Sequence, residues 1–221
     1  MLKNKSIIKN FSIILLFAVL ISACGKNEKT ASTNTNEKVK AKGSAFNVNT
    51  KESSINWLAK KVTGSHTGTI NISSGELIID NGKLTGGKFD IDFKTIAVLE
   101  LDDAEMNKKL TNHLISEDFF SAEKYPIGKF EISSVSEITN AASGNNYDIK
   151  GNMTIKGITK EISFPAKLNV DNKKANAEAS IELDRTEWDI KFRSGKFFEN
   201  LGDKLIYDKF NLVVKLSANS E

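Results

Sequence analysis

The segment from Asn112 to Pro126, N-H-L-I-S-E-D-F-F-S-A-E-K-Y-P, combines residue types that can do chemistry. His113 lies close to Glu117 and Asp118 in a chain with only two histidines. A histidine beside a carboxylate can transfer protons or hold a metal ion. The other histidine, His66, is distant in sequence, and neither has the H-x-H or H-x-x-x-H spacing of a metal site. We therefore expect His113 to cap a helix or to bond the backbone near Asp118.

Other arrangements that would indicate an enzyme are also missing from the sequence. No serine lies in a G-x-S-x-G setting, and the single cysteine, Cys24, lies in the N-terminal segment. Asp102, Asp103 and Glu105 lack the glycine and the spacing of a calcium-binding loop. We predict no catalytic residue, no metal and no cofactor, and hence no enzyme.

Two adjacent phenylalanines, Phe119 and Phe120, are the other distinctive part of this segment. Neighbouring side chains point in different directions unless the backbone is helical. We expect one ring to dock into the mouth of the fold and the other to pack beneath a helix. The pair either closes the end of the fold or gates an apolar tunnel, and the two roles are compatible.

The elements that must position these residues are β-strands. Apolar residues alternate with polar ones along most of the chain after residue 50, as expected for strands with one buried face. Turn residues such as Asp80-Asn81-Gly82, Ser143 to Asn146 and Asp171-Asn172 separate the runs. The alternation predicts about eight strands, centred on Ile55–Ala59, Ile70–Ile72, Phe89–Phe93, Phe130–Ile132, Tyr147–Ile149, Ile162–Val170, Ile181–Leu183 and Phe210–Leu216.

An eight-stranded sheet with one apolar face must cover that face, either as a sandwich or by closing into a barrel. Only residues 102–115 favour a helix, with Asp102 and Asp103 at its start. The pattern alone does not separate barrel from sandwich. An eight-stranded barrel encloses an interior that is either packed solid or able to hold one small ligand.

Three motifs give the sequence a family resemblance. Asn112–Pro126, Gly151–Lys160 (G-N-M-T-I-K-G-I-T-K) and Asp184–Trp188 (D-R-T-E-W) occur in the order found in the YceI-like family, which this chain resembles over roughly residues 45–218. The resemblance implies an all-β, antiparallel, lipocalin-like barrel and a role in binding polyisoprenoids or other long amphiphiles.

Arg185, in the third motif, has two interpretations. It either forms a structural ion pair, for example with Asp118, or joins Lys191 and Arg193 in contacting a ligand's phosphate or carbonyl oxygen. The structural role is favoured. The family pattern has a glycine where this chain has Asp189, which leaves the local turn geometry open.

The N-terminus has the features of a targeting segment. Lys3, Lys5 and Lys9 precede an apolar run that is too short to span a membrane. The run ends in Ile21-Ser22-Ala23-Cys24, which resembles the lipobox of bacterial lipoproteins. That resemblance implies a signal peptide over residues 1–23 and lipidation of Cys24.

Residues 24–44 are predicted to be a flexible tether, because polar residues dominate them and residues 25–43 contain no aromatic side chain. Residues 45–221 then form the barrel domain. The chain has 31 basic and 28 acidic side chains, but residues 1–23 hold three lysines and no acid. The mature protein is therefore formally neutral, which removes the charge argument for nucleic-acid binding.

We thus expect an envelope lipoprotein, anchored in the outer membrane and facing the periplasm or the surface, that carries, stores or protects a polyisoprenoid, an isoprenoid quinone or a similar lipid. The alternative is a stress protein with a filled core that works through a protein partner. An enzyme acting on an envelope lipid ranks last. The candidate lining residues are Trp57, Phe89, Phe93, Phe130, Phe164 and Phe210, with Phe119 and Phe120 at the mouth.

Overall fold

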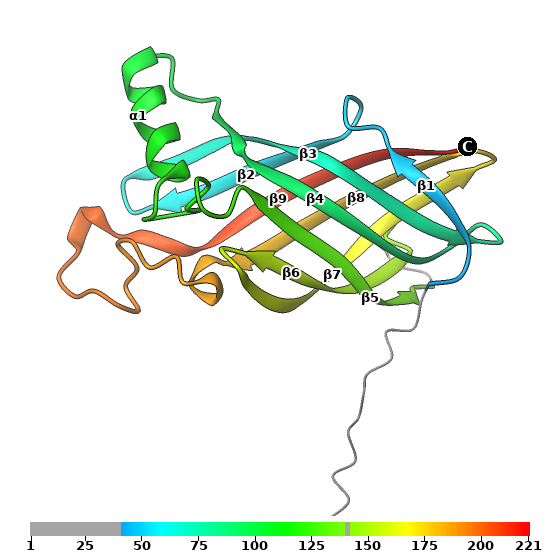
Figure 1. Cartoon of the computed structure of the whole chain (residues 1–221). Helices are drawn as coiled ribbons and strands as arrows, with labels where there is room; N and C mark the ends of the chain where they lie inside the picture. The colour runs from blue at the N-terminus through cyan, green and yellow to red at the C-terminus, as the bar shows by residue number, and fades with distance from the viewer. Residues whose placement is uncertain (1–40, 140–141) are drawn as a thin grey trace, which may run out of the picture. The chain divides into compact units, whose positions relative to one another are not determined.

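Antiparallel strands make up most of the computed structural model, which describes residues 41–139 and 142–221 (Figure 1). The predicted signal peptide, Cys24 and the tether as far as residue 40 lie outside these residues. The strands are β1 (Ser44–Val48), β2 (Ser54–Lys61), β3 (Gly64–Asp80), β4 (Lys83–Val98), β5 (Ile127–Glu137), β6 (Tyr147–Ile155), β7 (Ile158–Asp171), β8 (Lys174–Asp184) and β9 (Ile206–Ser220).

The sheet closes into the predicted eight-stranded antiparallel barrel. Neighbours follow the order β3-β2-β9-β8-β7-β6-β5-β4, and β4 pairs with β3 to complete the circle. The ninth strand, β1, occupies the same place in the wall as β2, because each lies between β3 and β9. One position in the barrel is thus filled by two short strands.

The break between β1 and β2 is fastened to β9 through Ser217. The backbone N–H of Asn49 donates to the Ser217 carbonyl at 2.8 Å, and the Ser217 N–H donates to Ser53 Oγ at 3.0 Å. The Ser217 hydroxyl donates to Glu52 Oε2 at 2.9 Å. Residues 49–53 therefore leave the wall without losing their attachment to it.

All eight predicted strands are confirmed, and their apolar residues face inward. β1 was not predicted because only one of its five residues, Phe46, is buried, so it carries no periodic signal. The β3–β4 hairpin turns at Asn81 and Gly82, whose φ angles of 50° and 77° are those that Asn-Gly accepts readily. The turn residues of the sequence thus mark this hairpin correctly.

The two ends of the barrel differ. At one end the β3–β4 and β7–β8 connections are short, and we call this the far end. At the other end lie both long connections, residues 99–126 and 185–205. We call it the helix end, because it carries α1 (Ala104–Ile115) and the short 3₁₀ helices η1 (Arg185–Trp188) and η2 (Gly202–Lys204) (Figure 1).

The helix α1 starts where the sequence predicted. Asp103 is its N-cap, and the Asp103 carboxylate accepts from the Met106 N–H at 2.8 Å. Ser116 ends it. Within the described ranges, no helix has both the length and the apolar character needed to cross a membrane.

Candidate functional site

The interior of the barrel contains two adjoining cavities. The far cavity has a volume of about 90 Å³ and the helix-end cavity about 100 Å³. Four residues, Ile55, Ile91, Met153 and Leu212, line both cavities and form the constriction between them. The barrel is therefore not filled solid, and its free space runs from one end toward the other.

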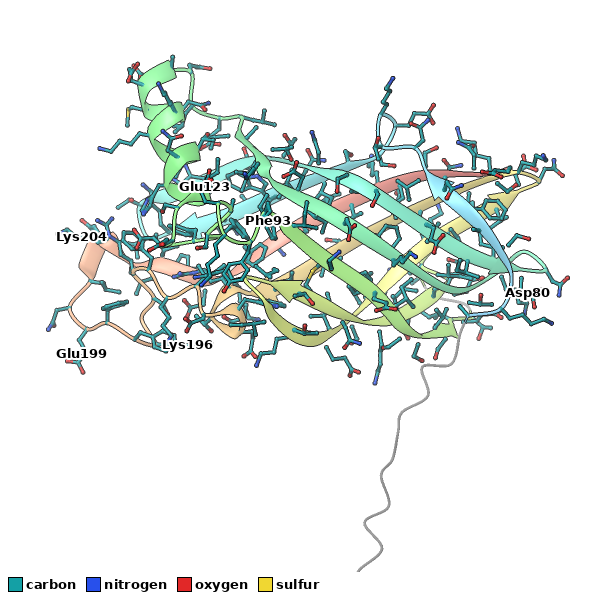
Figure 2. The ribbon with its side chains drawn as sticks, in the orientation of Figure 1. Asp80, Phe93, Glu123, Lys196, Glu199 and Lys204 are labelled. Carbon is teal, nitrogen blue, oxygen red and sulfur yellow. The ribbon has the colours of Figure 1, made fainter. Side chains whose placement is uncertain are left out.

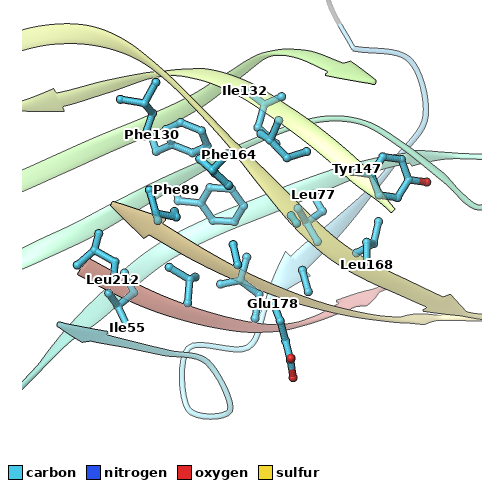
Figure 3. Close-up of a pocket in the computed structure, with 18 of the residues that line it drawn as sticks. Ile55, Leu77, Phe89, Phe130, Ile132, Tyr147, Phe164, Leu168, Glu178 and Leu212 are labelled. Atoms are coloured by element: carbon cyan, nitrogen blue, oxygen red, sulfur yellow. The ribbon is translucent and has the colours of Figure 1, made fainter. Parts of the chain in front are cut away.

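The far cavity has a hydrocarbon wall. Phe89, Phe130 and Phe164 form a row on one side, with centroid distances of 6.4 Å and 5.5 Å between successive rings. The inward face of β8 presents Ala177 and Ala179, whose small side chains leave the space unfilled. Figure 3 shows the rings around this cavity, and the Glu178 carboxylate pointing away from it.

The Phe130 ring needs a glycine to lie flat against the wall. A Cβ atom at Gly151, on the neighbouring strand β6, would come within 2.4 Å of the Phe130 ring. The one inward hydroxyl of the far cavity, that of Tyr147, lies 3.4 Å from the Leu84 N–H and accepts its hydrogen bond. The wall of the far cavity can therefore contact a ligand through its shape and its apolar surface, and it presents almost no hydrogen-bonding group.

Aromatic rings also line the helix-end cavity, but here some of them come from outside the barrel wall. Trp57, Phe93 and Phe210 project from strands, whereas Phe119 and Phe120 belong to the connection after α1. Phe120 stacks on Phe93 with centroids 4.7 Å apart. The connection therefore reaches into the barrel and supplies part of the cavity wall.

Phe119 packs on the helix side, as the sequence predicted for one ring of the pair. Its ring meets the edge of His113 at 5.0 Å and lies 5.6 Å from Phe192. His113 Nε2 lies 2.9 Å from Asp118 Oδ2, so the histidine bonds this side chain and not the backbone. We call residues 116–122 the lid; His113 holds the lid in place.

The second long connection starts with a buried tryptophan. Trp188 is 1% exposed, and its indole N–H donates to the Met153 carbonyl at 3.1 Å. Asp189, which replaces the family glycine, has φ 58° and ends η1 in the left-handed conformation. The turn therefore keeps a geometry that glycine accepts most easily, and an aspartate adopts it at a modest cost.

Asp184 caps η1 at its start. Its Oδ1 accepts hydrogen bonds from the Thr186 N–H and hydroxyl, and its Oδ2 accepts from Lys196 Nζ at 2.6 Å. Partial burial would raise the pKa of Asp184, but the hydrogen bonds from Lys196 and Thr186 outweigh it and hold that pKa below its ordinary value.

Arg185 is 5% exposed and is used inside the protein. Its guanidinium donates to the carbonyls of Ile190, Ile206 and Tyr207 at 3.0–3.3 Å. Its charge partner is Asp208, 3.2 Å away, and not Asp118 as suggested from the sequence. Asp118 bonds His113 instead.

Burial lowers the pKa of the Arg185 guanidinium, and the neighbouring Asp208 carboxylate opposes this shift. Asp208 Oδ1 is buried and has no hydrogen-bond partner, so its interaction with Arg185 is one of charge without good hydrogen-bond geometry. Asp208 was missed from the sequence, although it has the same parity along β9 as the inward residue Phe210.

The other two proposed head-group residues lie on the surface. Lys191 forms an ion pair with Asp189 and lies over the Phe197 ring. Arg193 lies over Phe192, 5.0 Å from its centroid, and lines an outer groove at the helix end. The structure thus separates the three cations: one is buried in the wall, one is paired on the surface, and one faces a groove.

The six candidate lining residues divide between the two cavities. Phe89, Phe130 and Phe164 line the far cavity, and Trp57, Phe93 and Phe210 line the helix-end cavity. Their position makes contact with a bound ligand possible, and whether they make that contact stays a prediction. Among residues 41–139 and 142–221, no group of three or more histidine, cysteine, aspartate or glutamate side chains is arranged to hold a metal ion.

A family model of the YceI-like domain matches residues 46–218. The chain belongs to the YceI-like family. A UPF0312 protein of Pseudomonas putida is 31% identical over 130 residues, which are 56% of this chain and 63% of the relative. The protein YceI of Escherichia coli is 29% identical over the same shares of the two chains. This YceI-like chain thus aligns with less than two thirds of the length of these curated relatives.

Solved structures share the YceI-like fold. BcnA of Burkholderia cenocepacia superimposes with a TM-score of 0.61 at 19% identity, over 78% of this chain and 99% of BcnA. A polyisoprenoid binding domain from Saccharophagus degradans, implicated in plant cell wall breakdown, gives a TM-score of 0.58 at 11% identity, over 80% and 99% of the two chains. At these identities the similarity establishes the fold.

Proposed function

We propose that this YceI-like barrel holds one long apolar molecule, such as a polyisoprenoid, an isoprenoid quinone or a similar lipid. The observation that carries the proposal is the pair of adjoining cavities with apolar walls, which share a constriction at Met153. A polyisoprenoid binding domain with the same fold supports this class of ligand.

Binding would draw its free energy from apolar burial, at about 25 cal/mol for each Å² removed from water before the costs of association. A long chain must pass the constriction to fill both cavities. Met153 suits this position because a thioether side chain is flexible and changes rotamer easily. The proposal is one of binding and carriage or storage, and not of catalysis.

The proposed location is the cell envelope. It rests on the lysine-rich start, the apolar run and Cys24, which together resemble a bacterial lipoprotein signal. A lipid on Cys24 and the following tether would keep the barrel near a membrane, for which the outer membrane is our proposal. Labelling the cells with a radioactive fatty acid, with Cys24→Ser as control, tests the anchor.

The binding function is tested by extracting the purified barrel with organic solvent and analysing the extract by mass spectrometry. We expect a lipid in near-stoichiometric amount, and a rise in melting temperature when a polyprenol or a quinone is added to lipid-free protein. If no lipid co-purifies and no added chain changes the melting temperature, the carrier function is wrong.

That negative result would favour the second candidate function, an envelope stress protein that acts through a protein partner. One observation supports this alternative. Phe197 and Phe198 are 47% and 49% exposed on the connection before β9, and adjacent exposed aromatic rings are typical of contact surfaces.

A further inference from the structure

Most of the large apolar side chains that remain exposed belong to one end of the barrel. Among the described residues seven such side chains are at least 44% exposed, and six of them lie at the helix end. The seventh, Val213, lies midway along β9 on the outer wall. The six are Val62, Leu99, Met106, Phe197, Phe198 and Tyr207. Exposed apolar side chains scattered singly need no explanation, but a group gathered at one end indicates a contact surface.

Two of these side chains, Phe197 and Phe198, are held outward by a buried turn. Ser194 is fully buried, and its carbonyl accepts from the Phe197 N–H at 3.1 Å and from the Phe198 N–H at 3.0 Å. The Ser194 hydroxyl oxygen accepts from the Lys196 N–H at 3.2 Å. The base of the connection is thus fixed in the fold, and both rings are kept at the surface, where a partner can bury them.

The turn between β2 and β3 joins the same surface. Val62 lies at its tip, and the Val62 N–H donates to the Leu205 carbonyl at 3.2 Å. Leu205 in turn packs beside Gly195, where an added Cβ atom would lie 3.2 Å from the Leu205 Cδ1. The turn is therefore fastened to the connection that carries the two phenylalanines. We call Val62, Phe197 and Phe198 the end patch.

Positive charge surrounds the end patch. The turn and the connection, residues 60–62 and 190–205, carry six basic and two acidic side chains, although the chain outside the N-terminal lysines is formally neutral. Lys61 and Lys204 form no ion pair within the part of the chain that the structure describes, whereas Lys196 is ion-paired. Figure 2 shows Lys196 and Lys204 at the helix end. An anionic surface would therefore attract this end of the barrel.

The composition of this surface favours a lipid bilayer over a protein partner. Lysine is depleted at protein–protein interfaces, where tyrosine, tryptophan and arginine are enriched. Phenylalanine with lysine around it is instead typical of surfaces that lie at the membrane interface, where the rings enter the acyl boundary and the ammonium groups contact anionic lipids. The long apolar stem of lysine lets its charge stay at the level of the headgroups while neighbouring rings go deeper.

We propose that the end patch docks the barrel on an anionic lipid bilayer. Its three apolar side chains enter the headgroup region, and the lysines around them contact the anionic headgroups. Docking turns the helix end, with its lid, toward the membrane. It requires no ligand in the barrel, so the inference goes beyond the proposed binding function and does not depend on it.

The proposed anchor at Cys24 leaves enough chain for this docking. β1 begins at the far end, where Ser44 pairs with Ile79 beside the β3–β4 turn. Residues 24–40 can span at most about 60 Å. The 15 residues of β9 cover about 50 Å, which exceeds the distance between the ends because barrel strands are tilted. A chain lipidated at Cys24 can therefore reach the membrane that holds its anchor with its helix end.

The test measures whether the helix end enters a bilayer. In the full chain with Cys24→Ser, an introduced cysteine is the only thiol, and it carries an environment-sensitive dye. One protein is labelled at Glu199→Cys, beside the end patch, and another at Lys173→Cys, in the far-end turn between β7 and β8; both positions are exposed. The vesicles contain phosphatidylglycerol and phosphatidylcholine, or phosphatidylcholine alone.

We expect the dye at position 199 to shift to the blue and to be quenched by brominated acyl chains in the anionic vesicles. The response should be weaker with phosphatidylcholine alone and should decrease as salt is raised. Insertion of the N-terminal segment cannot imitate this result, because that segment leads into β1 at the far end, on the side of position 173.

The apolar part of the docking is tested with Phe197→Ser/Phe198→Ser in the protein labelled at position 199. The docking equilibrium should weaken about tenfold or more, because two rings no longer leave water. The matched control Val213→Ser removes an exposed apolar side chain from the outer wall and should dock like the unchanged protein.

The charged part is tested with Lys61→Gln/Lys204→Gln. Docking on the anionic vesicles should weaken about 10- to 30-fold, since each lysine near an anionic surface contributes separately to the attraction. The control Lys167→Gln/Lys215→Gln removes two exposed lysines from the strands of the outer wall and should leave docking unchanged.

Three outcomes would overturn the inference. A dye at position 199 that does not respond to anionic vesicles excludes docking of this end. A response that survives the loss of both phenylalanines shows that the end patch does not carry it. An equal loss in the outer-wall lysine control assigns the attraction to overall charge. None of these results changes the lipid content of the interior, which extraction measures separately.

Discussion

The two cavities of the barrel are similar in volume but differ in how they are built. The far cavity is enclosed by strand residues alone, and its free space comes from the alanines of β8 opposite a row of phenylalanines. The helix-end cavity is partly enclosed by connections: the lid supplies Phe119 and Phe120, and Arg185 and Ile190 follow β8. A rigid wall of strands can limit the length of a bound ligand, whereas an end built from loops can open and can carry charged side chains.

The largest loss of stability is expected at the helix end, from breaking the Arg185–Asp208 pair. Arg185→Met removes the charge next to buried Asp208 and the donors to three carbonyls. We expect a loss of about 3–5 kcal/mol in the free energy of unfolding, because a buried carboxylate is left alone. Urea unfolding measures it. In the double variant Arg185→Met/Asp208→Asn part of the loss should return; a double variant no more stable than the single one contradicts this explanation.

The lid should matter next. Phe120→Ala removes the ring that stacks on Phe93 and should cost about 2 kcal/mol in stability, since the side chain is only partly buried. Release of a bound lipid should become faster, which stopped-flow fluorescence can follow. Phe198→Ala, which truncates an exposed ring at the same end, is the control and should change stability by less than about 0.5 kcal/mol.

The far cavity can be shortened from β8. Ala179→Leu places a larger side chain in free space, so stability should change little while affinity for a long chain falls about tenfold, or about 1.4 kcal/mol. A chain short enough to stop at the constriction should bind as before. Ser180→Leu adds the same side chain on the exposed face and serves as control. An equal loss for short and long chains would show that the two cavities do not act in series.

A smaller change in stability is expected at the left-handed turn of Asp189, in the connection that follows β8 at the helix end. Asp189→Gly and Asp189→Ala both remove the surface pair with Lys191, but only glycine accepts φ 58° without strain. The glycine variant should be more stable than the alanine variant by about 1 kcal/mol, measured by thermal unfolding. Equal stabilities would mean that the backbone relaxes out of the left-handed conformation.

Asp184 gives the smallest effect and one that depends on pH. Its pKa is below the ordinary value in the folded protein, so its charge stabilises the fold fully above about pH 5. That contribution is lost as the pH falls through the folded-state pKa, which lies below the ordinary value of an aspartate. Asp184→Asn keeps a capping side chain without the charge. The difference in unfolding free energy between the two proteins should be a few tenths of a kcal/mol, constant from pH 6 to 8, and should vanish at low pH.

Much of the barrel wall could be predicted from the sequence, because period-two alternation specifies which residues face inward. It identified eight strands and placed six aromatic residues on the inner face. It missed β1, where a single inward residue gives no period. It also missed Asp208, a charged residue on an apolar face that only its partner Arg185 explains.

The outer groove at the helix end could not be predicted in this way. Among the residues that line it are Lys60, Lys109 and Lys204, from segments far apart in the chain. Barrel closure and the two long connections bring these residues together, so no spacing in the sequence indicates the groove. The signal peptide, the lipidation of Cys24 and the tether as far as residue 40 stay predictions, since they concern residues outside the described part of the chain.

The way the barrel closes also determines when it can form. β1 and β2, near the start of the chain, complete the wall only by pairing with β9, the last strand to be synthesised, and the Ser53–Ser217 contact spans 164 residues. Contacts between such distant segments form late and slowly. Until β9 is in place the apolar faces of the other strands have no enclosed interior, so the chain has to finish folding before its cavities exist, and it is open to aggregation for that interval.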